Sequence, residues 1–135
     1  MHCGRERETK LSVVSGGHNY AAYSFSGDVV MLSHNMTGIA IDDTKKEISV
    51  QFGQELAPMA KAMAAKGYGL PDGTCPTVGV AGHALGGGGW SLATSRQWGW
   101  LVDHIMCLSL SPLFLFLFFF FFLAFGRVKT CRTDR

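Results

Sequence analysis

The chain has 135 residues and a formal net charge of +2, and this length allows one domain with a hydrophobic core but not a cofactor domain together with a substrate domain. The charge is uneven, because residues 1–105 contain 8 Lys and Arg against 9 Asp and Glu. No basic stripe with interleaved aromatic side chains occurs, so we expect no nucleic-acid partner. The four cysteines and five histidines are scattered, a pattern that indicates neither a metal site nor a disulfide framework.

Residues 1–105 have the pattern of an α+β domain. Strands are predicted at 10–14 and 28–32, and the segments 38–41 and 47–52 flank a polar turn as a hairpin would. From Leu56 to Ala64 the apolar residues recur at helical spacing, and Gly67 lies where a C-terminal cap is expected. Residues 69–89 are rich in glycine, which disfavours regular structure there.

The first motif with chemical content is Ser15-Gly16-Gly17-His18-Asn19-Tyr20, at the end of the first predicted strand. Glycines allow backbone N–H groups to curl around an anion such as a phosphate. An imidazole beside such a nest could attack whatever the phosphate anchors. On these residues alone, the favoured interpretation is a turn that ends the strand, followed by a surface histidine.

The second motif runs from Gly73 to Trp90 and contains seven glycines. Such density is typical of backbone pressed against a ligand, but neither a Walker A loop nor a Rossmann fingerprint is present. Cys75 lies among small residues, next to Pro76, where its thiol could be accessible and reactive. A buried, inert cysteine in a tight loop is the alternative.

Together the two motifs resemble flavoproteins of the vanillyl-alcohol-oxidase type, which have an FAD-binding PCMH-type domain. More narrowly, they resemble the berberine-bridge-enzyme and glucooligosaccharide-oxidase branch. The likeness continues through residues 99–105, so it covers most of residues 1–105 but only a middle section of the family's FAD domain.

The resemblance implies FAD held by two covalent bonds, from His18 to the flavin 8α-methyl carbon and from Cys75 to the flavin C6. It also implies pyrophosphate contacts from the first motif, flavin and ribityl contacts from the second, a histidine near the ribityl and pyrimidine side, and one position that influences oxygen access. The pyrophosphate contacts are Ser15, Gly16, Gly17 and Asn19, and the flavin and ribityl contacts are Gly79, Val80 and Gly82. The histidine is His83, and the position that influences oxygen access is Val78.

By the same resemblance, the parent protein would be an FAD-dependent oxidoreductase that oxidises alcohol groups. Its partners would be FAD, a small-molecule substrate (a sugar, or another alcohol) and O2 as electron acceptor. The family's second domain, which supplies the substrate site and the catalytic base, has no counterpart here, so no catalytic residue is named. We therefore expect the isolated chain to be inactive and to bind FAD poorly. The alternative is a non-catalytic truncated product able to associate with a membrane.

The composition changes near Ile105, and residues 106–135 form a Phe- and Leu-rich tail that ends in a basic stub. Phe, Leu and Ser have pyrimidine-rich codons, so translation of a polypyrimidine stretch would give this composition. We therefore favour an aberrant read-through tail on an incomplete PCMH-type domain. The alternative is a marginal membrane segment over residues 108–125, since a span needs about 20 apolar residues. Residues 1–8 are charged and indicate no signal peptide, although related proteins are commonly secreted, so the localisation is left open.

Overall fold

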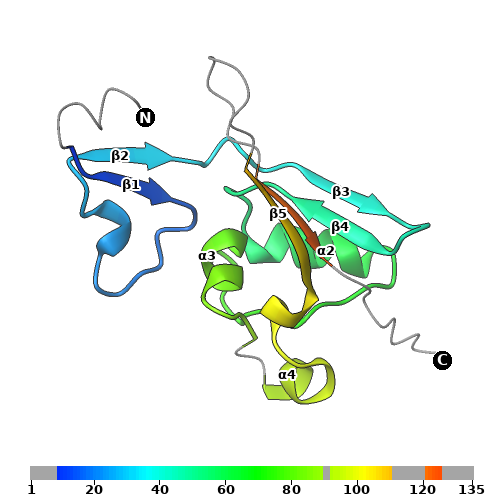
Figure 1. The fold of residues 1–135 in the computed structure, drawn as a ribbon. Coiled ribbons are helices and arrows are strands. Elements are labelled where there is room, and N and C mark those ends of the chain that lie inside the picture. The colour runs from blue at the N-terminus through cyan, green and yellow to red at the C-terminus, as the bar shows by residue number, and fades with distance from the viewer. Residues whose placement is uncertain (1–8, 90–91, 111–120, 126–135) are drawn as a thin grey trace.

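The computed structural model describes residues 9–89, 92–110 and 121–125 (Figure 1). In chain order the elements are β1 (Leu11–Val14), the 3₁₀ turn η1 (Tyr23–Phe25), β2 (Val29–Leu32), β3 (Ile39–Asp42), β4 (Glu47–Val50), α2 (Leu56–Ala64), α3 (Val80–Leu85), α4 (Leu92–Trp98), the 3₁₀ turn η2 (Leu101–His104), β5 (Ile105–Leu110) and β6 (Phe121–Phe125). Strands β1 to β4 come first, helices α2 to α4 follow, and β5 and β6 come last, so strands and helices are segregated along the chain and the predicted α+β class is confirmed.

The larger sheet has four antiparallel strands in the order β3-β4-β6-β5. Its hairpin β3–β4 is the one predicted from the polar turn, and Ile41 pairs with Ile48 in it. Ile48 and Val50 point their side chains into a core that α2 closes with Leu56, Met59 and Met63. The apolar spacing of residues 56–64 therefore produces a helix whose buried face covers this sheet.

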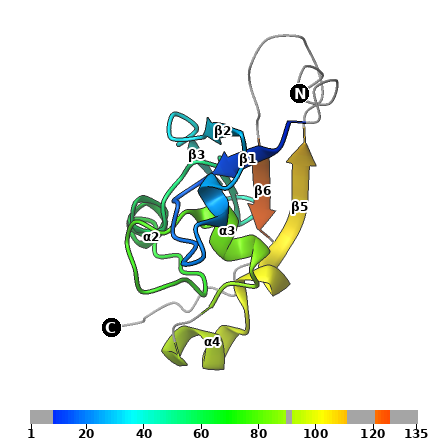
Figure 2. The same ribbon diagram turned by 90° about the vertical axis from the view of Figure 1, so that its left-hand side faces the viewer.

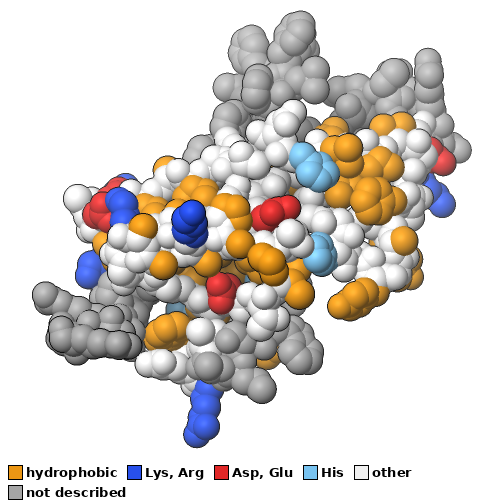
Figure 3. Space-filling view, turned by 180° about the vertical axis from the view of Figure 1, so that it is seen from behind, with side chains coloured by type: hydrophobic (Ala, Val, Ile, Leu, Met, Phe, Trp, Pro, Cys, Tyr) orange, Lys and Arg blue, Asp and Glu red, His pale blue; other side chains and the backbone are white. Residues whose placement is uncertain are grey.

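The second sheet is a parallel pair, β1 and β2, in which Leu11 lies opposite Val29 (Figure 1). The hydroxyl of Ser33, a buried residue just after β2, donates a 2.6 Å hydrogen bond to the carbonyl of Val14 at the end of β1. Several apolar side chains of the pair remain exposed, and Figure 3 shows hydrophobic side chains gathered at this end of the molecule. They include Leu11, Val13, Val29, Val30 and Leu32.

Helix α3 begins inside the glycine-rich segment and lies near the centre of the molecule, whereas α4 lies at its periphery (Figure 1, Figure 2). Regular structure was not expected here. It forms because Val80, Ala81 and Ala84 are all buried, and only one glycine, Gly82, falls within the helix. The remaining glycines flank the helix, and Gly87, Gly88 and Gly89 have φ values of +100°, +63° and +108°, which favour glycine.

Part of the Phe- and Leu-rich tail lies outside the described residues, namely 111–120 and 126–135. Within the described part, β6 pairs with both β4 and β5. No helix among the residues that the structure describes is long and apolar enough to cross a membrane. The division of the chain at residue 105 and the origin of the tail stay predictions.

Candidate functional site

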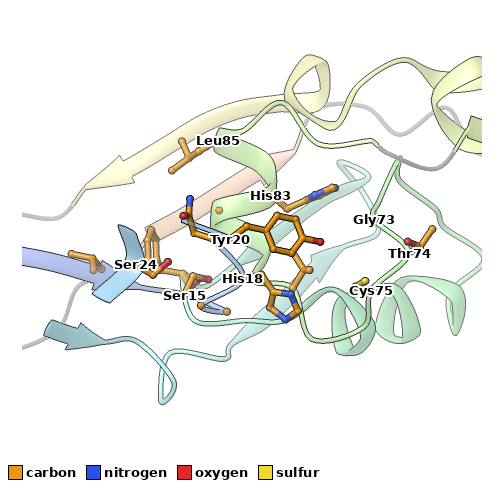
Figure 4. Close-up of a pocket in the computed structure, with 17 residues that line it drawn as sticks. Ser15, His18, Tyr20, Ser24, Gly73, Thr74, Cys75, His83 and Leu85 are labelled. Atoms are coloured by element: carbon orange, nitrogen blue, oxygen red, sulfur yellow. The ribbon is translucent and has the colours of Figure 1, made fainter. Parts of the chain in front are cut away.

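A cavity of about 820 Å³ lies between the end of β1, the loop before α3 and α3 itself (Figure 4). This volume falls in the range of about 300–1,000 Å³ that is usual for cofactor sites. Among its lining residues, glycines and residues with polar side chains outnumber the apolar ones. The lining residues are Val13, Ser15, Gly16, Gly17, His18, Asn19, Tyr20, Ser24, Phe52, Gly73, Thr74, Cys75, Val78, Gly79, Gly82, His83 and Leu85.

The loop after β1 forms one wall of the cavity. Its first residue, Ser15, donates a 2.7 Å hydrogen bond from its hydroxyl to the carbonyl of Phe52. Gly17 follows with a φ of +70°, in the left-handed region that favours glycine. Asn19 then closes the loop, because its Oδ1 accepts the N–H groups of Ala21 and Tyr23 at 3.0 and 3.3 Å. The loop is therefore shaped by its own side chains.

The loop that carries Cys75 forms the opposite wall and is attached to the start of α2. The N–H of Leu56 donates to the carbonyl of Val78 at 2.9 Å, and the N–H of Ala57 donates to the carbonyl of Pro76 at 3.0 Å. No side chain caps this helix start, so the loop carbonyls satisfy N–H groups that a helix leaves without partners in its first turn. The helix thus fixes the loop in place.

His18 and Cys75 come from these two separate loops and line the same cavity (Figure 4). Both side chains are exposed, and Cys75 is a free thiol. Nε2 of His18 lies 2.9 Å from Oγ1 of Thr77, in a hydrogen bond that joins the loops. The structure therefore brings together, on one surface, the two nucleophilic side chains that the sequence motifs singled out.

Helix α3 contributes the third wall through Gly82 and His83. A Cβ added to Gly82 would meet no atom within 4 Å, so the backbone of this residue faces open space. Nε2 of His83 accepts a 3.1 Å hydrogen bond from the N–H of Gly89. Burial lowers the pKa of His83, and the Asp72 carboxylate offsets part of this shift. For Asp72, burial raises the pKa, while a backbone hydrogen bond and His83 act in the opposite direction.

The sequence-predicted site residues all line the cavity except Val80. Val80 is fully buried, and its N–H donates to the carbonyl of Gln54 at 2.8 Å. Some lining residues were not singled out from the sequence. Tyr20 and Leu85 lie inside the two motifs and could have been included, whereas Val13 and Phe52 lie outside both motifs and reach the cavity only through the fold.

The fold and this cavity define a class of protein: a cofactor-binding α+β domain in which glycine-rich backbone and two nucleophilic side chains surround the ligand site. The chain belongs to the family described as "FAD binding domain", which matches residues 1–110. FAD is the cofactor of this family, and the residues fit it, because the open backbone at Gly82 leaves room where a Cβ would project into the cavity.

Three relatives illustrate the likeness. The chain is 34% identical over 109 residues to berberine bridge enzyme-like 5 of Arabidopsis thaliana, and the match covers 77% of this chain and 20% of the relative. A xylooligosaccharide oxidase of Myceliophthora thermophila, solved in complex with xylobiose, superimposes with a TM-score of 0.70 at 35% identity over 77% of this chain and 22% of that chain. A glucooligosaccharide oxidase of Acremonium strictum, solved with 6-S-cysteinyl, 8α-N1-histidyl FAD, gives a TM-score of 0.67 at 33% identity over 78% of this chain and 22% of that chain.

The chain spans about a fifth of the length of the curated relatives that it matches. These relatives are berberine-bridge-enzyme-like proteins and carbohydrate oxidases. The family resemblance drawn from the sequence is therefore confirmed.

Proposed function

We propose that this chain is the FAD-attachment segment of a bicovalent flavin-dependent oxidoreductase. The observation that carries the proposal is that His18 and Cys75, from two loops, line one cavity with exposed side chains. In this proposal His18 bonds the flavin 8α-methyl carbon and Cys75 bonds the flavin C6. A cavity that merely bound a nucleotide would need neither nucleophile.

The remaining residues hold the cofactor without reacting. Backbone N–H groups at Ser15, Gly16 and Gly17 would hold the pyrophosphate, and because Oδ1 of Asn19 already accepts two N–H groups, Asn19 would contribute its amide N–H groups. Gly82 would leave space along the flavin and ribityl chain, Gly79 would contribute backbone that packs against Gly16, and the buried Val80 supports that backbone from behind. This assignment divides the predicted residues into those that touch FAD and one that positions them.

His83 lies at the cavity with its ring half-buried and a lowered pKa, so it favours the neutral form. Since Nε2 accepts the N–H of Gly89, the neutral ring carries its proton on Nδ1. In the proposed site Nδ1–H is a donor that can stabilise negative charge on the ribityl and pyrimidine side of the bound cofactor. When bound, FAD supplies the two-electron redox chemistry of the parent enzyme.

The parent reaction that we propose is the oxidation of an alcohol group, with sugars as favoured substrates and O2 as electron acceptor. The relatives include oxidases named for xylooligosaccharide, chitooligosaccharide and glucooligosaccharide, which supports a sugar. Val78, at the position expected to influence oxygen access, is a half-buried residue that lines the cavity. Its small side chain supports reaction with O2.

The alternative, a non-catalytic truncated product, rests on the short length of the match and on the exposed apolar side chains of β1 and β2. These exposed strands are the physical reason to expect that the isolated chain holds FAD poorly. Nothing in the relatives favours this alternative over the oxidoreductase segment.

A chimera separates the two. Residues 9–110 would replace the matching segment of the Acremonium strictum glucooligosaccharide oxidase, which supplies the rest of that domain and the second domain. After acid precipitation we expect flavin to remain on the chimera and to be absent from the isolated 135-residue chain. A chimera that folds but releases all of its flavin into the acid supernatant would overturn the proposal.

A further inference from the structure

Thr77 contacts the proposed attachment histidine although it does not line the cavity. Its Oγ1 lies 2.9 Å from Nε2 of His18, across a sequence separation of 59 residues. No hydrogen bond to Nδ1 of His18 is present among the described residues. The two ring nitrogens of His18 therefore have different surroundings.

The backbone on both sides of Thr77 is fixed. The carbonyls of its two neighbours, Pro76 and Val78, accept the N–H groups of Ala57 and Leu56 at the start of α2. These bonds hold the Thr77 backbone against a helix that packs on the core through Leu56 and Met59. The hydroxyl of Thr77 is thus presented from a rigid support rather than from a free loop.

The loop that carries His18 is fixed against the same support. A Cβ built on Gly16 would come within 2.8 Å of the carbonyl oxygen of Thr77 and would collide with the backbone nitrogen of Gly79. Ser15 holds the start of the loop through its bond to the carbonyl of Phe52. Close packing of the two backbones therefore determines the Thr77–His18 contact.

We propose that Thr77 is a positioning residue: its Oγ1 accepts the Nε2–H of His18 and thereby leaves the lone pair on Nδ1 as the attacking nitrogen. This inference rests on the proposed function of His18. A neutral imidazole has one donor and one acceptor nitrogen, and the hydrogen bond at one nitrogen selects the tautomer. With the opposite arrangement Nδ1 would carry the proton and Nε2 would be occupied by the hydroxyl, so neither nitrogen could attack.

The attachment step balances with O2 as the oxidant. The C–N bond forms from the Nδ1 lone pair, while the flavin 8α-methyl group loses one C–H bond and the imidazole loses its proton from Nε2. The two electrons released pass to O2, which takes up both protons and becomes H2O2. The exposed Thr77 hydroxyl can relay that proton, because its oxygen accepts the proton from Nε2 while the hydroxyl releases its own proton to solvent.

Long-range 1H–15N NMR of the full 135-residue chain, labelled with 15N-histidine, tests the proposal without FAD. At about pH 9, well above the ordinary histidine pKa of about 6.5, the spectrum distinguishes the two neutral tautomers, and the His18→Gln variant identifies the His18 signals. We expect His18 to be protonated at Nε2. Removing the acceptor with Thr77→Val should lower the ratio of the Nε2–H to the Nδ1–H tautomer by roughly twofold to tenfold, the effect of one net hydrogen bond.

Two variants and one internal reference make the result specific. Thr77→Ser keeps the hydroxyl and should keep the ratio of the original chain. Thr74→Val removes a threonine from the same loop and should leave His18 unchanged, as should the signal of His34, an exposed histidine. A neutral His18 protonated at Nδ1, or a ratio that Thr77→Val does not change, would overturn the proposal. Because FAD is absent, failure of the chimera to retain flavin is a separate outcome that overturns the proposed function alone.

Discussion

Gly16 and Gly79 lie backbone to backbone, so close that a Cβ added to either one would collide with the other. This contact joins the loop that carries His18 to the loop that leads from Cys75 into α3. A side chain at either position would push the two loops apart. The relationship explains why both motifs need a glycine at a position where neither φ is in the left-handed region.

Replacement of Gly16 by Ala should lower the free energy of unfolding by about 1–3 kcal/mol, the usual range for forcing an extra group into a packed site. The nearest neighbours of the new Cβ are all backbone atoms, which cannot move aside at low cost. Urea denaturation followed by circular dichroism measures the change. Gly38→Ala is the control, since its new Cβ would meet only the flexible side chain of Gln51 at 2.9 Å. Equal losses in the two variants would contradict the contact.

Replacement of Gly82 by Ala should separate stability from cofactor attachment. A Cβ on this residue has no atom within 4 Å, and alanine favours a helix over glycine by up to about 1 kcal/mol. We therefore expect unchanged or slightly higher stability. The added methyl group would project into the cavity, so in the chimera the fraction of protein that carries acid-stable flavin should fall. Retention of the full amount of flavin would show that FAD does not lie against Gly82.

Replacement of Ser33 by Ala tests the connection between β1 and β2. The buried hydroxyl donates to the carbonyl of Val14 at 2.6 Å, and after its loss that carbonyl still accepts the N–H of Ser33 at 3.1 Å. We therefore expect the free energy of unfolding to fall by about 0.5–1.5 kcal/mol, the net contribution of one hydrogen bond. Ser26→Ala removes a comparable bond, to the carbonyl of Tyr23 at 3.0 Å, at an exposed position. That control should change the free energy of unfolding by less than about 0.5 kcal/mol. A larger loss at Ser26 than at Ser33 would contradict the account.

His83 should make the stability of the chain depend on pH. Burial lowers its pKa in the folded state, and Asp72 offsets only part of this effect, so the unfolded chain takes up a proton at a higher pH than the folded one. The free energy of unfolding is then maintained above the unfolded histidine pKa of about 6.5 and falls as the pH drops below it. His83→Asn should weaken this fall between about pH 7.5 and 5.5, a window set by the same reference value. His34→Asn, at an exposed position, should preserve it; identical slopes in the two variants would argue against a buried, neutral His83.

The sequence contained enough to predict β1, β2, the β3–β4 hairpin and α2, because each has a local pattern. Alternation in residues 47–52 and helical spacing in residues 56–64 arise from burial of one face, and burial is what the structure shows for Ile48, Val50 and Met59. Helix α3 could not be predicted, since the burial of its Val80, Ala81 and Ala84 overrides a glycine-rich composition. Tertiary packing, rather than local propensity, decides that segment.

Most of the site could be predicted because its residues lie in two short motifs. The contribution of Phe52, the hydrogen bond between His18 and Thr77, and the close approach of Gly16 to Gly79 depend on segments far apart in the chain. Val80 is a residue for which the motif was misleading, because it lies inside the motif but faces the core. Successive residues of a helix point in different directions, so a residue next to one that lines the cavity can be buried in the interior.

Peptide mapping of the chimera tests the central claim most directly. After digestion under acid conditions, the flavin absorbance should travel with a single cross-linked species that joins the peptide containing His18 to the peptide containing Cys75. In the single variants His18→Ala and Cys75→Ala the flavin should remain on the other peptide, and in the double variant it should be lost. Flavin bound at any other residue, or acid-stable flavin on the double variant, would contradict the assignment of His18 and Cys75 as the two attachment points.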